Sequence, residues 1–79
     1  MSPTVFKFNG YRFFFFSKEE RRPHVHVSCA DGEAKFWLDP VVELARNYGL
    51  SQVQIGEMQK IVEDRKDELI RAWRSHFRG

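Results

Sequence analysis

The sequence has little cysteine, little net charge and no long apolar segment. A single cysteine, Cys29, can form neither an intramolecular disulfide nor a four-cysteine zinc site. This excludes the disulfide-stapled secreted domains and predicts a reducing, cytoplasmic environment. The longest apolar run, residues 13–16, is far shorter than the roughly 18 residues of a membrane-spanning helix, so we expect no membrane partner. The net charge of +2 is too small to indicate nucleic-acid binding by itself.

Aromatic residues, in contrast, are abundant and unevenly distributed. They make up 15% of the chain, and nine of the twelve lie within the first 37 positions. A chain of 79 residues has material for one hydrophobic core, which predicts a single domain over residues 1–79. Such a short domain is marginally stable unless nearly every large apolar side chain contributes to the core.

Two β-hairpins are predicted in the first half of the chain. Asn9-Gly10 and Asp31-Gly32 favour two-residue turns, because asparagine, aspartate and glycine tolerate the positive φ that these turns require. The flanking segments are rich in β-branched and aromatic residues, which is typical of strands. The predicted strands are residues 4–8 and 11–17 in the first hairpin, and residues 24–30 and 33–39 in the second.

The second half predicts a short strand and a long helix. Residues 41–46 fit either a fifth strand or one helical turn, and Val41 and Val42 favour the strand. Ser51 and Gln54 form a capping-box pattern that begins a helix. Apolar residues then recur at helical spacing, which predicts one helix over residues 51–77 after a sheet half over residues 1–46. The expected fold class is α+β, with an antiparallel sheet of four to five strands (two hairpins plus a short fifth strand) packed against one long C-terminal helix.

The predicted hairpins place two sets of side chains on opposite faces of the sheet. A two-residue loop at Asp31-Gly32 would set His24 opposite Asp39 and His26 opposite Trp37. One helix covers only one face, so the face with the histidines is predicted to be an uncovered binding surface. The relative registry of the two hairpins is left open. The predicted surface comprises Arg12, Phe14, Phe16, Arg21, Arg22, His24, His26, Lys35 and Trp37.

Several segments together resemble a known family. They are Gly-Tyr-Arg-Phe-Phe-Phe at residues 10–15, Pro-His-Val-His-Val at residues 23–27, Gly-Glu-Ala-Lys-Phe at residues 32–36, and Glu68-Leu69 with Trp73. The chain resembles the small prokaryotic proteins of the family called domain of unknown function 4160. That resemblance implies a partner, a small protein encoded nearby in an arrangement similar to toxin–antitoxin modules. It supplies no catalytic residue.

The two histidines carry the chemical alternatives. His24 and His26 alternate on one strand, which puts them roughly 6.5 to 7 Å apart on one face. They could share a metal, with Asp39 or Glu33 as further ligands. Cys29 would not be a ligand of such a site, because it points to the other face. A His24–Asp39 pair could instead act as a base beside Arg21 or Arg22 in a metal-independent ribonuclease. In a purely structural role, the imidazoles would bond to Asp39 and stack on Trp37.

Exposed rings interleaved with cations could also stack on the bases of RNA or single-stranded DNA. Our leading hypothesis is a protein-interaction domain without enzymatic activity or cofactor, one component of a two-protein toxin–antitoxin-like module. The ribonuclease or nucleic-acid-binding alternative and the metal-binding alternative stay open, as does a homodimer.

Overall fold

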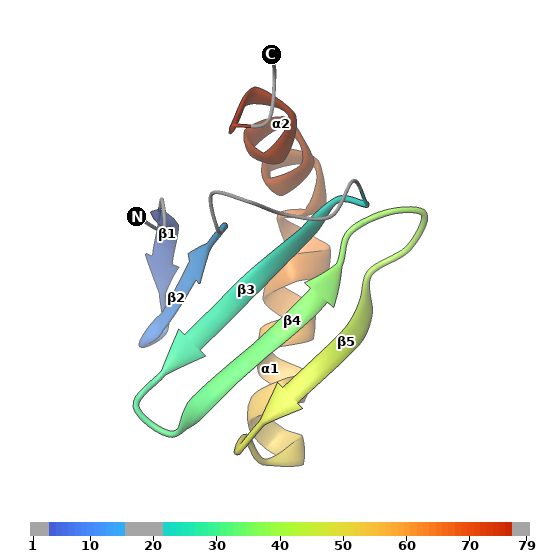
Figure 1. Ribbon diagram of the computed structural model, residues 1–79. Helices are drawn as coiled ribbons and strands as arrows, with labels where there is room; N and C mark the ends of the chain where they lie inside the picture. Colours follow the sequence, from blue (N-terminus) through green and yellow to red (C-terminus); the bar gives the residue numbers. More distant parts are fainter. Residues whose placement is uncertain (1–3, 16–21, 77–79) are drawn as a thin grey trace.

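The computed structural model describes residues 4–15 and 22–76, and they form an α+β fold. Five antiparallel strands lie in the order β1-β2-β3-β4-β5, and two helices cover one face of this sheet (Figure 1). None of the helices in the described residues is long and apolar enough to cross a bilayer. The elements are β1 Thr4–Phe8, β2 Tyr11–Phe14, β3 His24–Cys29, β4 Gly32–Trp37, β5 Glu43–Tyr48, α1 Gln52–Asp64 and α2 Lys66–His76.

The first hairpin forms at the predicted turn. Asn9 and Gly10 have φ values of 58° and 81°, as a two-residue turn of this type requires. The turn pairs β1 with β2 in the register of a regular two-residue hairpin, with Phe8 opposite Tyr11, until a bulge sets Thr4 opposite Phe14. A regular hairpin around Asn9-Gly10 would set Thr4 opposite Phe15, and the bulge changes this partner by one residue because it inserts an extra residue into β1.

The second hairpin has a different register from the predicted one. Cys29 pairs with Gly32, so the two loop residues are Ala30 and Asp31. Gly32 is not a turn residue but the first residue of β4, where a Cβ would collide with the carbonyl oxygen of Tyr48. A glycine is required there because the end of β5 passes directly against it.

This shift of two residues keeps every side chain on its predicted face but changes its partner across the sheet. The predicted pairs of His24 with Asp39 and of His26 with Trp37 are therefore wrong. His24 lies opposite Trp37, and His26 lies opposite Lys35.

The fifth strand exists, and it begins and ends two residues later than predicted. β5 pairs antiparallel with β4, with a bulge between the positions opposite Lys35 and Phe36. The preference for a strand over a helical turn is thus confirmed, while the connection at residues 39–42 is not part of the strand.

The helical half contains two helices, so the prediction of one long helix is wrong. The capping box is confirmed: Ser51 Oγ accepts from the Gln54 amide at 3.2 Å, and Gln54 Oε1 accepts from the Ser51 amide at 2.9 Å. The helix breaks at Arg65, where φ is −113°. Between Val62 and Leu69 all six residues are charged, so no apolar side chain holds this segment to the sheet. The part of the prediction that covers residue 77 lies outside the described residues.

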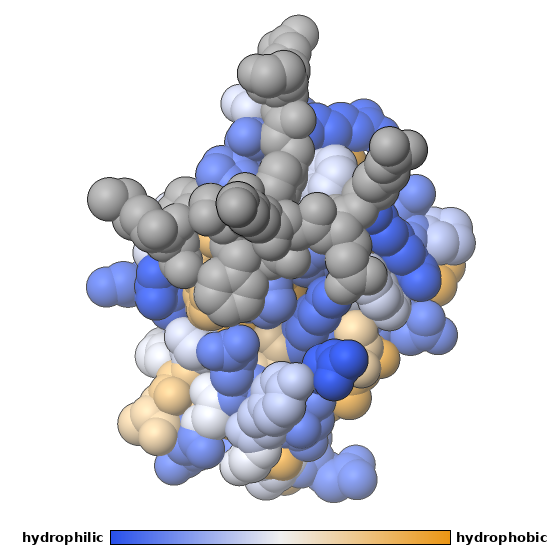
Figure 2. Space-filling model, in the orientation of Figure 1, coloured by the Kyte–Doolittle hydropathy of each residue, from blue (hydrophilic) through white to orange (hydrophobic). Residues whose placement is uncertain are grey.

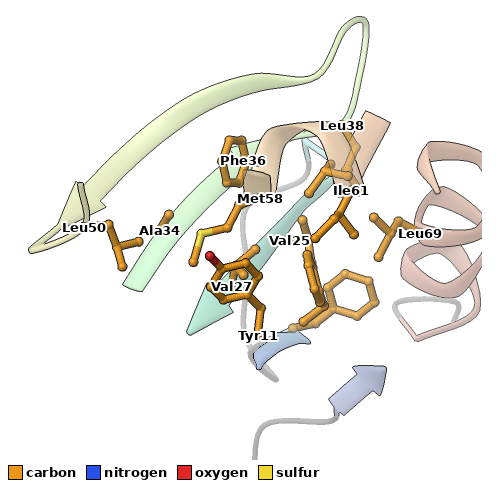
Figure 3. Close-up of a cluster of buried hydrophobic side chains, with 13 residues drawn as sticks. Tyr11, Val25, Val27, Ala34, Phe36, Leu38, Leu50, Met58, Ile61 and Leu69 are labelled. Atoms are coloured by element: carbon orange, nitrogen blue, oxygen red, sulfur yellow. The ribbon is translucent and has the colours of Figure 1, made fainter. Parts of the chain in front are cut away.

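The core lies between the sheet and the two helices. Figure 3 shows Met58 and Ile61 of α1 pointing toward the strands, with Leu69 of α2 alongside. The Arg65 guanidinium lies over the rings of Phe6 at 4.6 Å and Phe8 at 5.1 Å, so it joins β1 to the helix junction. The buried core residues are Tyr11, Phe13, Phe15, Val25, Val27, Ala34, Phe36, Leu38, Leu50, Met58, Ile61, Val62 and Leu69.

A hydrogen bond from the Tyr11 hydroxyl to Glu57 Oε1, 2.5 Å long, links β2 to α1. This bond, with some contribution from burial, raises the pKa of Tyr11 from 10.0 to about 12.

We expect Tyr11→Phe to lower the free energy of unfolding by about 1 kcal/mol at pH 7. The raised pKa means that the stabilisation is complete below pH 10 and is lost as the pH rises toward 12.

Urea unfolding of wild type and of Tyr11→Phe, at pH 7 and at pH 11, measures the contribution of this hydrogen bond to the free energy of unfolding. The difference in unfolding free energy between wild type and Tyr11→Phe should shrink at pH 11. A difference that is the same at both pH values would contradict the role of this bond.

Candidate functional site

The candidate site lies on the face of the sheet that the helices do not cover. We call it the helix-free face, and it lies toward the viewer in Figures 1 and 2. Where its residues are described, Figure 2 shows a mostly hydrophilic surface with apolar colour at the margins. Of the predicted surface residues, Phe16 and Arg21 lie outside the described residues. The structure brings the others together: Arg12, Phe14, Arg22, His24, His26, Lys35 and Trp37.

His24 and His26 are buried in this face, although the sequence predicted that they would be exposed. Their relative exposures are 0% and 7%. The His24 ring meets the edges of His26 and Trp37 at centroid distances of 5.3 and 5.7 Å. His24 Nδ1 lies 2.7 Å from the carbonyl oxygen of Arg22. The histidines therefore form the floor of the site rather than its outer layer.

Phe14 covers His26 from the neighbouring strand. The register between β2 and β3 places Phe14 directly opposite His26, which supplies the hairpin registry that the sequence left open. The two rings stack at 5.5 Å, and Phe14 is itself buried. Above Phe14 lies the guanidinium of Arg12, 4.5 Å from the ring centroid. A cation over an aromatic face is attracted by the ring quadrupole, so this stacking positions the charge.

Trp37 holds two further cations. The Arg22 guanidinium lies 4.4 Å from the Trp37 ring centroid, and the Lys35 ammonium lies 4.5 Å from it. Arg22 also donates from Nε to the carbonyl oxygen of Asp39 at 2.8 Å. A longer contact of 3.9 Å joins Arg22 to the carboxylate of Glu43. The half-buried indole thus organises positive charge at one end of the helix-free face.

The acidic residues proposed to work with the histidines are placed differently. Asp39 is exposed and contributes its backbone carbonyl to Arg22, not its carboxylate to His24. Glu33 lies closer, with Oε2 3.8 Å from His26 Nδ1. Among residues 4–15 and 22–76, no group of three or more histidine, cysteine, aspartate or glutamate side chains could hold a metal ion.

Sequence reasoning missed the part of this face that β5 contributes. The pairing of β4 with β5 puts Glu43, Arg46 and Tyr48 on the same face as Trp37, Lys35 and Glu33. The only available signal was the strand preference of residues 41–46, which did not fix which side chains point outward. As a whole, the helix-free face offers cations at fixed positions around an aromatic and imidazole floor.

Comparisons with known proteins give one match. The family model described as "Domain of unknown function (DUF4160)" matches residues 10–74, a range that contains every described residue of the predicted surface. No curated protein matches the chain. No solved structure matches it either.

Burial of His24 has a measurable consequence for stability. We expect His24→Ala to lower the free energy of unfolding by about 2 to 3 kcal/mol, because it opens a cavity and removes the contact to the Arg22 carbonyl. Asp39→Asn, at an exposed carboxylate, should change it by less than about 0.5 kcal/mol. Chemical denaturation at neutral pH measures both variants. Equal small effects would mean that His24 is a surface residue after all.

Proposed function

Since the chain belongs to the DUF4160 family, whose description assigns no activity, we propose from the site itself that this is a protein-interaction domain. Its helix-free face binds an acidic segment of a partner protein. The observation that carries this proposal is the stacking of Arg12 on Phe14 and of Arg22 and Lys35 on Trp37.

Stacked cations suit a binding surface because they are already ordered. Long basic side chains lose conformational freedom when they bind a ligand, and this loss weakens binding. A cation held over a ring has lost part of that freedom beforehand. The rings in turn are supported by buried histidines from the central strand β3. Carboxylates of a partner segment are the complementary ligands for such cations.

An acidic protein segment fits this arrangement better than single-stranded nucleic acid does. Base stacking needs accessible ring faces. Phe14 already contacts the Arg12 guanidinium and the His26 ring, and Trp37 contacts Arg22 and Lys35. A base would have to displace these contacts, whereas a carboxylate would bind to the cations as they stand.

The burial of the histidines favours the same choice over a ribonuclease. A general base must come within hydrogen-bond reach of the proton that it removes. His24 has no exposed surface and His26 has 7%, so a substrate would reach neither without rearrangement of the face. The acid–base and metal-binding alternatives become outcomes of the test below.

We further propose that the partner is the small protein encoded nearby and that the two form a toxin–antitoxin-like module in the cytoplasm. This part of the proposal rests on the family resemblance and on the single free thiol at Cys29. The helix-free face would be the surface that captures the partner.

Binding to the product of the adjacent gene tests the proposal. Isothermal titration calorimetry should show a complex whose affinity falls as salt is raised. The double variant Arg22→Gln/Lys35→Gln should weaken it by at least about tenfold, because it removes both cations held by the indole. Trp37→Ser should weaken binding by a similar factor, because it removes the ring on which both cations stack. The matched control Lys60→Gln/Arg71→Gln removes two exposed cations from the helices and should leave binding unchanged.

Several results would overturn the proposal. One is the absence of a complex. Another is a complex that the control variant weakens as much as the double variant does. RNA cleavage or toxicity that His26→Ala abolishes while partner binding persists would favour the ribonuclease. A mass in native mass spectrometry that a chelator lowers would favour the metal site.

A further inference from the structure

We propose that β5 is a self-association site, through which two copies of the chain pair their β5 strands antiparallel to form one continuous ten-stranded sheet. This inference does not depend on the proposed function, because it concerns pairing between two copies of the chain and needs no other partner.

The edge at β5 exposes apolar side chains. β5 is the last strand of the sheet, and it lies on the outer side of β4 in Figure 1. Among the described residues, five large hydrophobic side chains are exposed, and three of them lie in or just before this strand: Val41, Leu44 and Tyr48. An exposed edge strand offers unpaired backbone groups to another strand, and apolar residues on it favour that pairing.

A bulge gives this edge an unusual arrangement of charge. Glu43 lies opposite Trp37 and Arg46 lies opposite Lys35, so both point to the helix-free face. In a regular strand, two residues three positions apart would point to opposite faces. Here they point to the same face because the bulge at Ala45 adds one residue to β5. The two residue steps from Leu44 to Arg46 lie opposite a single residue step of β4.

This arrangement is complementary to itself. In an antiparallel pair related by a two-fold axis, Leu44 can lie opposite Ala45 of the second copy. Glu43 of each copy then lies opposite Arg46 of the other, on the same face, and forms two equivalent ion pairs. The same register sets Val41 opposite Tyr48, which covers two of the exposed apolar side chains. Opposite charges and apolar pairs directly across a strand pair both stabilise it.

The contacts that these two charged residues make within the chain are long ones. Glu43 lies 3.9 Å from Arg22, and its side chain is 63% exposed. Arg46 donates to the Tyr48 hydroxyl at 3.4 Å. Both charges are therefore accessible to a second copy. A second copy satisfies Glu43 and Arg46 together, which a purely acidic partner strand would not do.

Sedimentation equilibrium of the full chain tests this inference without any partner. Wild type should show a dimer whose population grows with concentration, and which raised salt weakens. Arg46→Glu and Glu43→Arg should each weaken dimerisation by at least about tenfold, because each places two like-charge pairs across the interface. The double variant Glu43→Arg/Arg46→Glu should restore it to within about threefold of wild type, since the pairs are re-formed with exchanged signs.

Lys60→Glu makes a charge reversal of the same size on the exposed surface of α1 and should not change dimerisation. Thermal unfolding shows whether each variant is folded. If a single variant is unfolded, the salt dependence of the wild-type dimer still tests the inference. A wild-type chain that stays monomeric up to about 1 mM would overturn the inference. So would single reversals that leave the dimer intact, or a double variant that fails to restore it.

Discussion

Gly32 lies where three strands meet, because it pairs with Cys29 of β3 and lies directly against the end of β5. The Tyr48 carbonyl occupies the space that a Cβ on Gly32 would need, so only glycine fits there. In the pairing that begins at Gly32, Lys35 lies opposite His26 and Trp37 lies opposite His24. The helix-free face follows from that register: Trp37 reaches His24, and the Trp37 ring in turn supports Arg22 and Lys35. A shift of two residues would exchange Trp37 for Asp39 opposite His24.

The many aromatic residues in the first half of the chain lie on both faces of the sheet. Phe13 and Phe36 pack under the helices, while Phe14 and Trp37 stand on the opposite face. If they were exposed, such rings would form an apolar patch of a kind that soluble monomers rarely carry. On this face the rings instead pack against the buried imidazoles, and cations stack on the rings. The result is an ordered, positively charged surface on a chain whose net charge is only +2.

Much of the fold could be predicted from local patterns. The alternation of residues 24–29 and 33–37 assigns each side chain to its correct face, because that assignment depends only on parity. The Asn9-Gly10 turn and the Ser51–Gln54 capping box are also local, and both are confirmed. The cross-strand partners were not predictable, because Gly32 next to Asp31 has the sequence of a turn, while its actual constraint comes from the distant Tyr48. The helix break at Arg65 was not predicted either, because the apolar residues keep a helical spacing of seven from Val62 to Leu69 across it. Burial of His24 and His26 follows from packing across three strands, so alternation alone could not separate a buried imidazole from an exposed one.

We propose that the helix-free face is the binding surface and that its cations recognise the ligand. The most direct measurement is a two-dimensional ¹H–¹⁵N NMR titration of the full chain with a polyglutamate peptide. We expect the largest shifts on the indole Nε1–H of Trp37 and on the amides of β3 and β4 around His26 and Lys35. Shifts confined to α2, or no shifts at low salt, would contradict it.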